Sequence, residues 1–191
     1  MTKLYSAYPD IADMIGPNTN INEVPKFPHS SYEVHVPWTS LERTILDHTT
    51  EYGLDLNPDF QREHVWTTRQ QIAYVEYMLM GGEVSKTLVF GADNWTGGKL
   101  GNYQLLDGKQ RLEAVRAFLR DEIPAFRRTK SEFLGKLNFT SHGFNWRVVD
   151  LRTRADVLKL YLALNSGGTP HQPEELQRVQ GLLAIELKGG K

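Results

Sequence analysis

The sequence contains no cysteine among its 191 residues. This absence excludes disulfide scaffolds, thiol nucleophiles, and zinc or iron–sulfur sites built on cysteine thiolates. The chain also lacks any run of the roughly 18–20 apolar residues that cross a bilayer, and it lacks the apolar region of a signal peptide at its N-terminus. We therefore expect a cytoplasmic protein with no membrane partner.

A large excess of charge of either sign is missing too, because 22 Lys and Arg residues are matched by 23 Asp and Glu residues. The balance is uneven along the chain: residues 1–110 contain 8 basic and 14 acidic residues, whereas residues 111–159 contain 11 and 6. This locally basic part could attract phosphates or nucleic acid, or it could form the solvated faces of ordinary helices. With 40% hydrophobic residues, the chain can bury a substantial core.

Prolines are concentrated near the N-terminus, where five of the nine precede residue 40. Proline has no backbone N–H and disfavours a helical conformation at the residue before it. The sequence therefore predicts an extended N-terminal arm over residues 1–40 with little regular structure, followed by a single domain over residues 41–191.

Helical spacing and short apolar runs alternate after the arm. Interleaved elements of this kind are typical of an α/β or α+β domain. Caps and apolar periodicity predict helices from Leu41 toward Gly53, from Thr67 toward Gly81, from the turn at Gly108 toward Asp121 and Pro124, from Thr153 to Leu164 and from Pro173 toward Gly189. Short apolar runs predict strands at Thr87 to Phe90, Tyr103 to Leu106 and Trp146 to Leu151.

The turn after the second predicted strand carries the strongest chemical signal. Residues 106–112 read Leu-Asp-Gly-Lys-Gln-Arg-Leu, so the strand ends in Asp-Gly and passes directly into a helix. The amides of Gly108, Lys109 and Gln110 then lie at a helix N-terminus, where unpaired donors and the helix dipole favour anions. Lys109 and Arg111 add cations suited to phosphate. The spacing alone also fits a glycine turn followed by a helix with exposed charges.

A second polar cluster precedes the helix that begins after Thr67. Residues 57–67 read Asn-Pro-Asp-Phe-Gln-Arg-Glu-His-Val-Trp-Thr. Phe60 and Trp66 are expected in the core. A simple loop does not explain the dense polar centre between these two aromatics.

These two motifs together resemble the N-terminal domain of GmrSD-type modification-dependent restriction enzymes, which are related to ParB and sulfiredoxin. The hallmark of that family is Asp-Gly-Gln-Gln-Arg, and here Lys109 replaces the first glutamine, so that a cation replaces an amide. The run Ala-Leu-Asn-Ser-Gly-Gly-Thr-Pro at residues 163–170 and the Glu-Glu-Leu at residues 174–176 also resemble the family's loop and helix start.

The resemblance, which extends from about Leu41 to Leu183, implies an α+β ParB/sulfiredoxin-like fold with short strands, a phosphate-binding strand-turn-helix and C-terminal helices. It implies a nucleoside triphosphate, ATP or GTP, and Mg²⁺ as cofactors. The resemblance implies that Gly108, Lys109 and Gln110 contact the phosphates. It implies that Arg111 neutralises charge on the transferred phosphoryl group and that Asp107 orients a water, a hydroxyl or a metal ion. Gln61 and Arg62 would close the site from the other side, and Asn165 would make a weaker contact.

Three functions remain open on these grounds. The leading hypothesis is an NTP-dependent phosphotransferase or NTPase linked to DNA modification or restriction, including kinase activity on a hydroxymethylated base. The second is a nucleotide-gated module that recruits DNA or an effector without turnover. The third is a DNA-binding adaptor whose turn contacts backbone phosphates. The histidines of residues 1–191 form no His-x-x-x-His or HNH-like cluster. The Glu-Leu-Lys at residues 186–188 fits a restriction-nuclease Glu-x-Lys fragment, but its Pro-Asp partners lie far upstream, and such a tripeptide occurs mostly by chance. We therefore expect DNA cleavage to need a nuclease partner or an unrecognised site.

Overall fold

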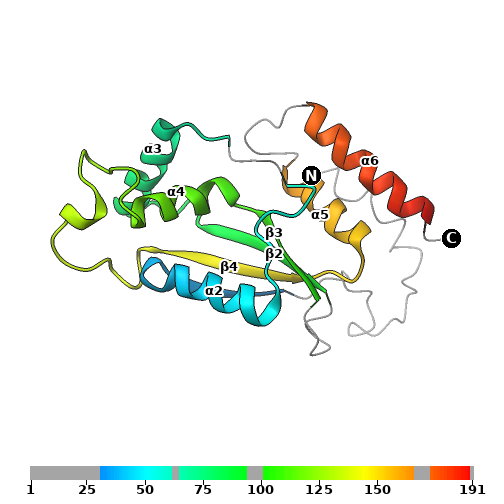
Figure 1. The fold of residues 1–191 in the computed structure, drawn as a ribbon, viewed down its shortest axis with the longest axis horizontal. Coiled ribbons are helices and arrows are strands. Elements are labelled where there is room, and N and C mark those ends of the chain that lie inside the picture. Colours follow the sequence, from blue (N-terminus) through cyan, green and yellow to red (C-terminus); the bar gives the residue numbers. More distant parts are fainter. Residues whose placement is uncertain (1–30, 62–64, 94–100, 166–172, 190–191) are drawn as a thin grey trace, which may run out of the picture.

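The computed structural model describes residues 31–61, 65–93, 101–165 and 173–189. Its centre is a mixed four-stranded sheet flanked by helices (Figure 1). The sheet has the order β1-β4-β2-β3, in which β4 is antiparallel to β1 and parallel to β2, and β2 is antiparallel to β3. The strands are β1 (Ser31–Pro37), β2 (Thr87–Asp93), β3 (Gly101–Asp107) and β4 (Gly143–Asp150).

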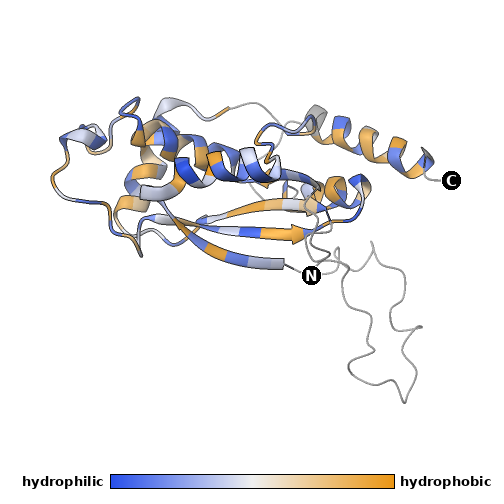
Figure 2. Cartoon of the chain, turned by 60° about the horizontal axis from the view of Figure 1, so that its bottom comes forward, coloured by the Kyte–Doolittle hydropathy of each residue, from blue (hydrophilic) through white to orange (hydrophobic). Residues whose placement is uncertain are grey.

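Helices cover both faces of this sheet because successive strand side chains point to opposite sides. Leu88 and Phe90 of β2 belong to a core shared with α2, α3 and α4, whereas the intervening Val89 belongs to a second core shared with α5 and α6. Figure 2 shows hydrophobic and hydrophilic positions interleaved along these elements. The helices are α2 (Leu41–Tyr52), α3 (Thr68–Leu79), α4 (Lys109–Leu119), α5 (Arg154–Asn165) and α6 (Pro173–Gly189), with short 3-10 helices at Trp38–Ser40 and Lys130–Glu132.

Local sequence signals placed most helix ends correctly, and the α+β class is confirmed. The Thr67 hydroxyl accepts a hydrogen bond from the Gln70 amide, while the Gln70 side chain accepts one from the Thr67 amide, which completes the expected capping box. Gly53 ends α2 in the left-handed conformation with φ of 67°, as a C-terminal glycine often does. Within the described ranges, no helix is long and apolar enough to span a bilayer.

The expectation of little regular structure before residue 41 is wrong for residues 31–40. Residues 31–37 form β1, which pairs with β4 in a register that sets Val34 opposite Trp146. Pro37 ends the strand at the edge of the sheet, where a missing N–H disturbs no inner ladder. The proline count therefore concealed a short alternating strand, and residues 1–30 lie outside the described part of the chain.

Candidate functional site at the start of helix α4

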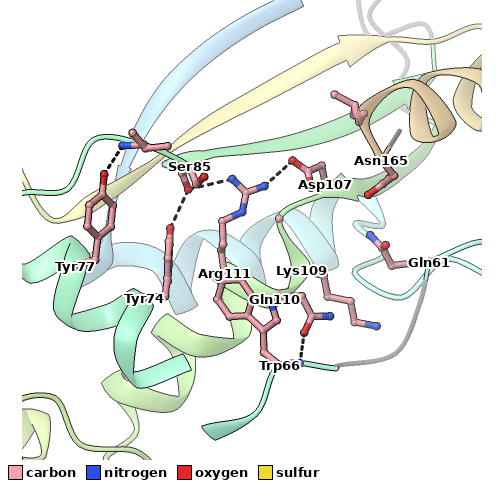
Figure 3. Close-up of a pocket in the computed structure, with 13 residues that line it drawn as sticks. Gln61, Trp66, Tyr74, Tyr77, Ser85, Asp107, Lys109, Gln110, Arg111 and Asn165 are labelled. Carbon is pink, nitrogen blue, oxygen red and sulfur yellow. Dashed lines mark hydrogen bonds and ion pairs between the residues drawn. The ribbon is translucent and has the colours of Figure 1, made fainter. Parts of the chain in front are cut away.

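A cavity of about 680 Å³ opens where β3 ends and α4 begins (Figure 3). It brings together the strand-turn-helix that the sequence singled out and side chains from the loop before α3, from α3 itself and from the end of α5. Its lining residues are Gln61, Trp66, Tyr74, Tyr77, Val84, Ser85, Asp107, Gly108, Lys109, Gln110, Arg111, Leu164 and Asn165.

Gly108 makes the sharp turn from β3 into α4. Its φ is 103°, a conformation that L side chains rarely adopt, and a Cβ at this position would clash with Cδ2 of Leu88. Gly108 occupies the N-cap position without a side-chain hydrogen bond, and the first turn of α4 carries no acidic residue. The positive end of the α4 dipole is therefore not compensated by a carboxylate of its own first turn.

Asp107 and Arg111 lie on the two sides of this turn and pair with each other. Nη2 of Arg111 donates to Oδ2 of Asp107 at 2.5 Å, and Nη1 of Arg111 donates to the carbonyls of Ser85 and Thr87 at 3.0 Å each. The Arg111 side chain is 13% exposed and that of Asp107 is 36% exposed. The guanidinium is thus held in place by the backbone before β2, while the carboxylate faces the cavity.

The side chain of Gln110 joins α4 to the loop that precedes α3. Its Oε1 accepts hydrogen bonds from the amides of Val65 at 2.9 Å and Trp66 at 3.0 Å, and the residue is buried. Oε1 of Gln110 thus satisfies two backbone N–H groups of the loop. Because Gln110 belongs to the first turn of α4, the position of Trp66 depends on the start of that helix. The sequence predicted a phosphate contact for Gln110 and did not predict this link.

Gln61 and Asn165 line the opposite side of the cavity from Arg111 (Figure 3). Nε2 of Gln61 donates to the carbonyl of Leu105 on β3 at 3.2 Å, and Nδ2 of Asn165 donates to the carbonyl of Tyr161 at 2.8 Å. The structure therefore brings described residues of all three sequence motifs to one cavity, while residues 166–172, which hold most of the third motif, lie outside the described part of the chain. Arg62, also predicted to close the site, lies outside the described residues.

Two arginines that sequence reasoning missed hold the backbone beside Gln61. Arg154 of α5 forms an ion pair with Asp59 at 2.6 Å, and Arg178 of α6 donates to the carbonyls of Asp59 at 2.7 Å and Phe60 at 3.0 Å. Phe60 itself is fully buried, as expected, with its ring centre 5.0 Å from that of Tyr161. The C-terminal helices thus fix one side of the cavity from a distance in sequence that no local pattern reveals.

Aromatic side chains form the remaining wall and were also missed, apart from Trp66. The Tyr74 hydroxyl donates to the Ser85 carbonyl at 2.9 Å, and burial raises the pKa of Tyr74. The Tyr77 hydroxyl accepts from the Val84 amide at 3.0 Å. Trp66 meets Tyr74 edge to face and is half-buried, so it lines the cavity as well as packing on the core. The i, i+3 spacing of Tyr74 and Tyr77 in the sequence could have indicated that both side chains lie on one face of α3.

The described lining of this cavity suits a divalent cation as the companion of an anionic ligand. Among the lining residues that the structure describes, Asp107 is the one carboxylate, and one of its oxygens already accepts from Arg111. In the part of the chain that the structure describes, no three His, Asp or Glu side chains gather as a metal site. Mg²⁺ commonly takes one or two carboxylates and completes its shell with phosphate oxygens and water, which this donor set allows.

The family model of the GmrSD restriction endonuclease N-terminal domain matches residues 43–180. The chain belongs to this family. Membership points to a role in restriction. Neither the curated proteins nor the solved structures contain a significant match to the chain.

Proposed function

We propose that the cavity at the start of α4 binds ATP or GTP with Mg²⁺, and that this GmrSD-family domain is an NTP-dependent phosphotransferase or NTPase acting in DNA modification or restriction in the cytoplasm. The observation that carries the proposal is the N-terminus of α4, whose first turn carries no acidic residue and which lines a cavity of about 680 Å³ beside Lys109. Helix N-termini bind phosphate through backbone amides and the helix dipole. A cavity of this size accommodates a ligand larger than a single phosphate.

In this proposal the phosphates lie against the turn and the base lies against the aromatic wall. The backbone of Gly108 approaches closely because it has no side chain, and Lys109 supplies a cation. Trp66 and Tyr77 offer apolar faces in the lining of the same cavity. Gln61 and Asn165 supply polar groups opposite the turn, and Gln110 acts by holding Trp66 in position.

Asp107 and Arg111 carry the proposed chemistry. Asp107 orients a water or an acceptor hydroxyl and accepts its proton as the oxygen attacks the terminal phosphorus. The bond from that phosphorus to the bridging oxygen breaks, and the nucleoside diphosphate leaves with the electron pair. Arg111, fixed by the Ser85 and Thr87 carbonyls, neutralises charge on the transferred group. If Asp107 instead held Mg²⁺, the ion would add to that neutralisation. A hydroxymethylated base in DNA is one candidate acceptor.

A nucleotide-gated module is the second candidate, and the link made by Gln110 favours it. Because Gln110 ties the start of α4 to the loop before α3, a ligand that moves the turn also moves Trp66. Such coupling recruits DNA or a nuclease partner without turnover.

The deciding experiment follows the label of γ-labelled ATP and GTP with Mg²⁺, first without DNA and then with plain or hydroxymethylated DNA. Label on DNA establishes a kinase, and label released as phosphate establishes an NTPase. Asp107→Asn should abolish both while retaining nucleotide binding, whereas Asp47→Asn, an exposed carboxylate on α2, should change neither. Bound but unchanged nucleotide would support the gated module. DNA binding that needs no nucleotide, with no nucleotide bound, would support a plain adaptor and contradict the proposal.

A further inference from the structure

A second cavity, of about 280 Å³, lies at the other end of α4. Because α4 has 11 residues, its two ends are about 15 Å apart along its axis. The second cavity lies between the ends of α3 and α4 and the irregular chain that follows α4, which projects at the left of Figure 1. Three phenylalanines and two lysines contribute to its lining: Phe118, Phe126, Phe133, Lys130 and Lys136.

Residues 126–139, which we call the aromatic–basic segment, combine bulky apolar and cationic side chains. They include four basic residues and one acidic residue. Leu134 is fully exposed, and three phenylalanines of the segment are also classed as exposed. Figure 2 shows orange and blue positions side by side along this part of the chain. Apolar side chains gathered on a surface mark a contact site for another molecule.

The acidic groups of this region are turned toward its own backbone. Glu132 accepts a hydrogen bond from the Thr129 amide at 2.7 Å, and Asp121 accepts one from the Ser131 amide at 2.8 Å. These hydrogen bonds lower the pKa of both carboxyl groups, with help from nearby Arg128 and Lys130. Both carboxylates therefore stay ionised, and Glu76 of α3 adds a third, because its Oε1 accepts from the Phe126 amide at 2.7 Å. The segment itself still has four basic residues against one acidic residue, a net positive charge that complements a polyanion.

A tight turn presents an aromatic and a cation at the cost of backbone strain. The amides and carbonyls of Ala125 and Arg128 bond to each other at 2.8 and 3.0 Å, which leaves Phe126 and Arg127 as the two residues of the turn. Both have positive φ, 50° and 63°, as a type I′ turn requires. Asn-Gly suits that turn, whereas bulky residues cost about 1–2 kcal/mol each there. Strain retained at an exposed turn supports a functional demand on its side chains.

We propose that the aromatic–basic segment and its cavity bind single-stranded nucleic acid. An unstacked base packs against Phe126 and Phe133 in the cavity, and flanking phosphates lie near Arg127, Lys130 and Lys136. Aromatic platforms interleaved with cations are how proteins bind single strands with little sequence preference. An acidic peptide would use the cations but would leave the aromatic-lined cavity without a planar partner, so the nucleic acid is favoured. This site makes no use of the cavity at the start of α4.

The first test measures fluorescence anisotropy of labelled dodecathymidylate with the full chain, without nucleotide, over a range of salt. Lys136→Gln should reduce the slope of log Kd against log salt by about one, while Lys159→Gln, an exposed lysine on α5, should match the parent. An oligomer with the same phosphates but abasic sugars should bind about five- to hundredfold more weakly. Equal affinity for the abasic oligomer, or equal effects of the two lysine substitutions, would overturn the proposal.

The second test separates binding from folding. The double substitution Phe126→Asn with Arg127→Gly installs the residues that the turn prefers, so it should raise the urea midpoint of unfolding. It should also weaken oligonucleotide binding by about tenfold or more, because one aromatic and one cation are lost. A purely structural role predicts a higher midpoint with unchanged affinity, and that result would overturn the proposal.

The partner class and the nucleotide site are checked in the same samples. An acidic, phenylalanine-containing peptide that binds more tightly than the oligonucleotide would overturn the assignment to nucleic acid. Phosphate release from ATP without DNA should be the same for Lys136→Gln and for the parent chain. If neither chain releases phosphate but the oligonucleotide results hold, the proposed enzymatic function fails and the nucleic-acid site stands.

Discussion

The two ends of α4 use side chains in opposite ways. At its start, Asp107, Gln110 and Arg111 are joined to each other or to nearby backbone. At its end, Leu134 and Phe139 extend outward from an irregular segment. A fixed polar turn suits a small ligand whose atoms must be placed accurately, whereas an exposed aromatic and basic surface suits a flexible polymer. The same helix therefore separates the proposed nucleotide site from the proposed nucleic-acid site.

The largest expected effect comes from adding a side chain at Gly108. Gly108→Val places atoms against Leu88 and forces a β-branched residue to a φ of 103°, so we expect a loss of about 3–5 kcal/mol in unfolding free energy. Gly53→Ala is the matched control, because Gly53 also has positive φ, 67°, but open space around it. Urea denaturation measures both. Equal losses of unfolding free energy in the two variants would show that the close contact between residue 108 and Leu88 does not contribute to the effect.

Removing the acceptor of Gln110 should have the next largest effect. Gln110→Leu leaves the amides of Val65 and Trp66 without the oxygen they now share, at a cost of about 1–3 kcal/mol. Gln110→Glu retains an acceptor and should lose less. Amide hydrogen exchange at Val65 and Trp66 should accelerate in the leucine variant, while exchange in residues 126–139 stays unchanged. Acceleration in both regions would contradict the separation between the two ends.

A double-mutant cycle on Asp107 and Arg111 should give a smaller energy. Although the two groups lie within 2.5 Å, Asp107 is 36% exposed and solvent screens the pair, so we expect a coupling of about 0.5–1 kcal/mol. Thermal unfolding of Asp107→Asn, Arg111→Lys and the double variant measures it. A coupling near zero would mean that the pair does not hold the turn.

Acidification should have the smallest effect, at the other end of α4. Glu132 and Asp121 have folded-state pKa values below their ordinary 4.5 and 3.8, because the backbone amides of Thr129 and Ser131 bond to the ionised forms. Their stabilisation is therefore present above those ordinary values and is lost as pH falls through the lowered ones. Nuclear magnetic resonance should show the Thr129 and Ser131 amides shifting together in that range. Glu132→Gln should remove the shift at Thr129, and an unaltered shift would contradict the assignment.

Local structure could be predicted from the sequence where a short pattern of neighbouring residues determines it. The capping box at Thr67 and Gln70, and the turn at Gly108, depend on neighbours within a few residues, and both form as expected. The family was recognisable because three motifs occur in the right order, and the family match confirms it. The roles of Asp107 and Arg111 in phosphoryl transfer stay predictions.

Long-range contacts could not be read in the same way. Arg154 and Arg178 hold the segment near Asp59 from about a hundred residues away in the chain, and the link from Gln110 to Trp66 crosses 44 positions. β1 was missed because prolines dominate its surroundings, while its partner strand lies more than a hundred residues later. Such contacts follow from the packed fold and leave no local periodicity.

The most direct test of the account is a titration of the isotopically labelled chain with a non-hydrolysable ATP analogue and then a GTP analogue, each with Mg²⁺, followed by nuclear magnetic resonance. The account predicts that the amides of Gly108, Lys109 and Gln110 and the indole N–H of Trp66 shift together for at least one nucleotide, while residues 126–139 do not. Shifts confined to residues 126–139, or no shift at millimolar nucleotide, would contradict a nucleotide site at the start of α4.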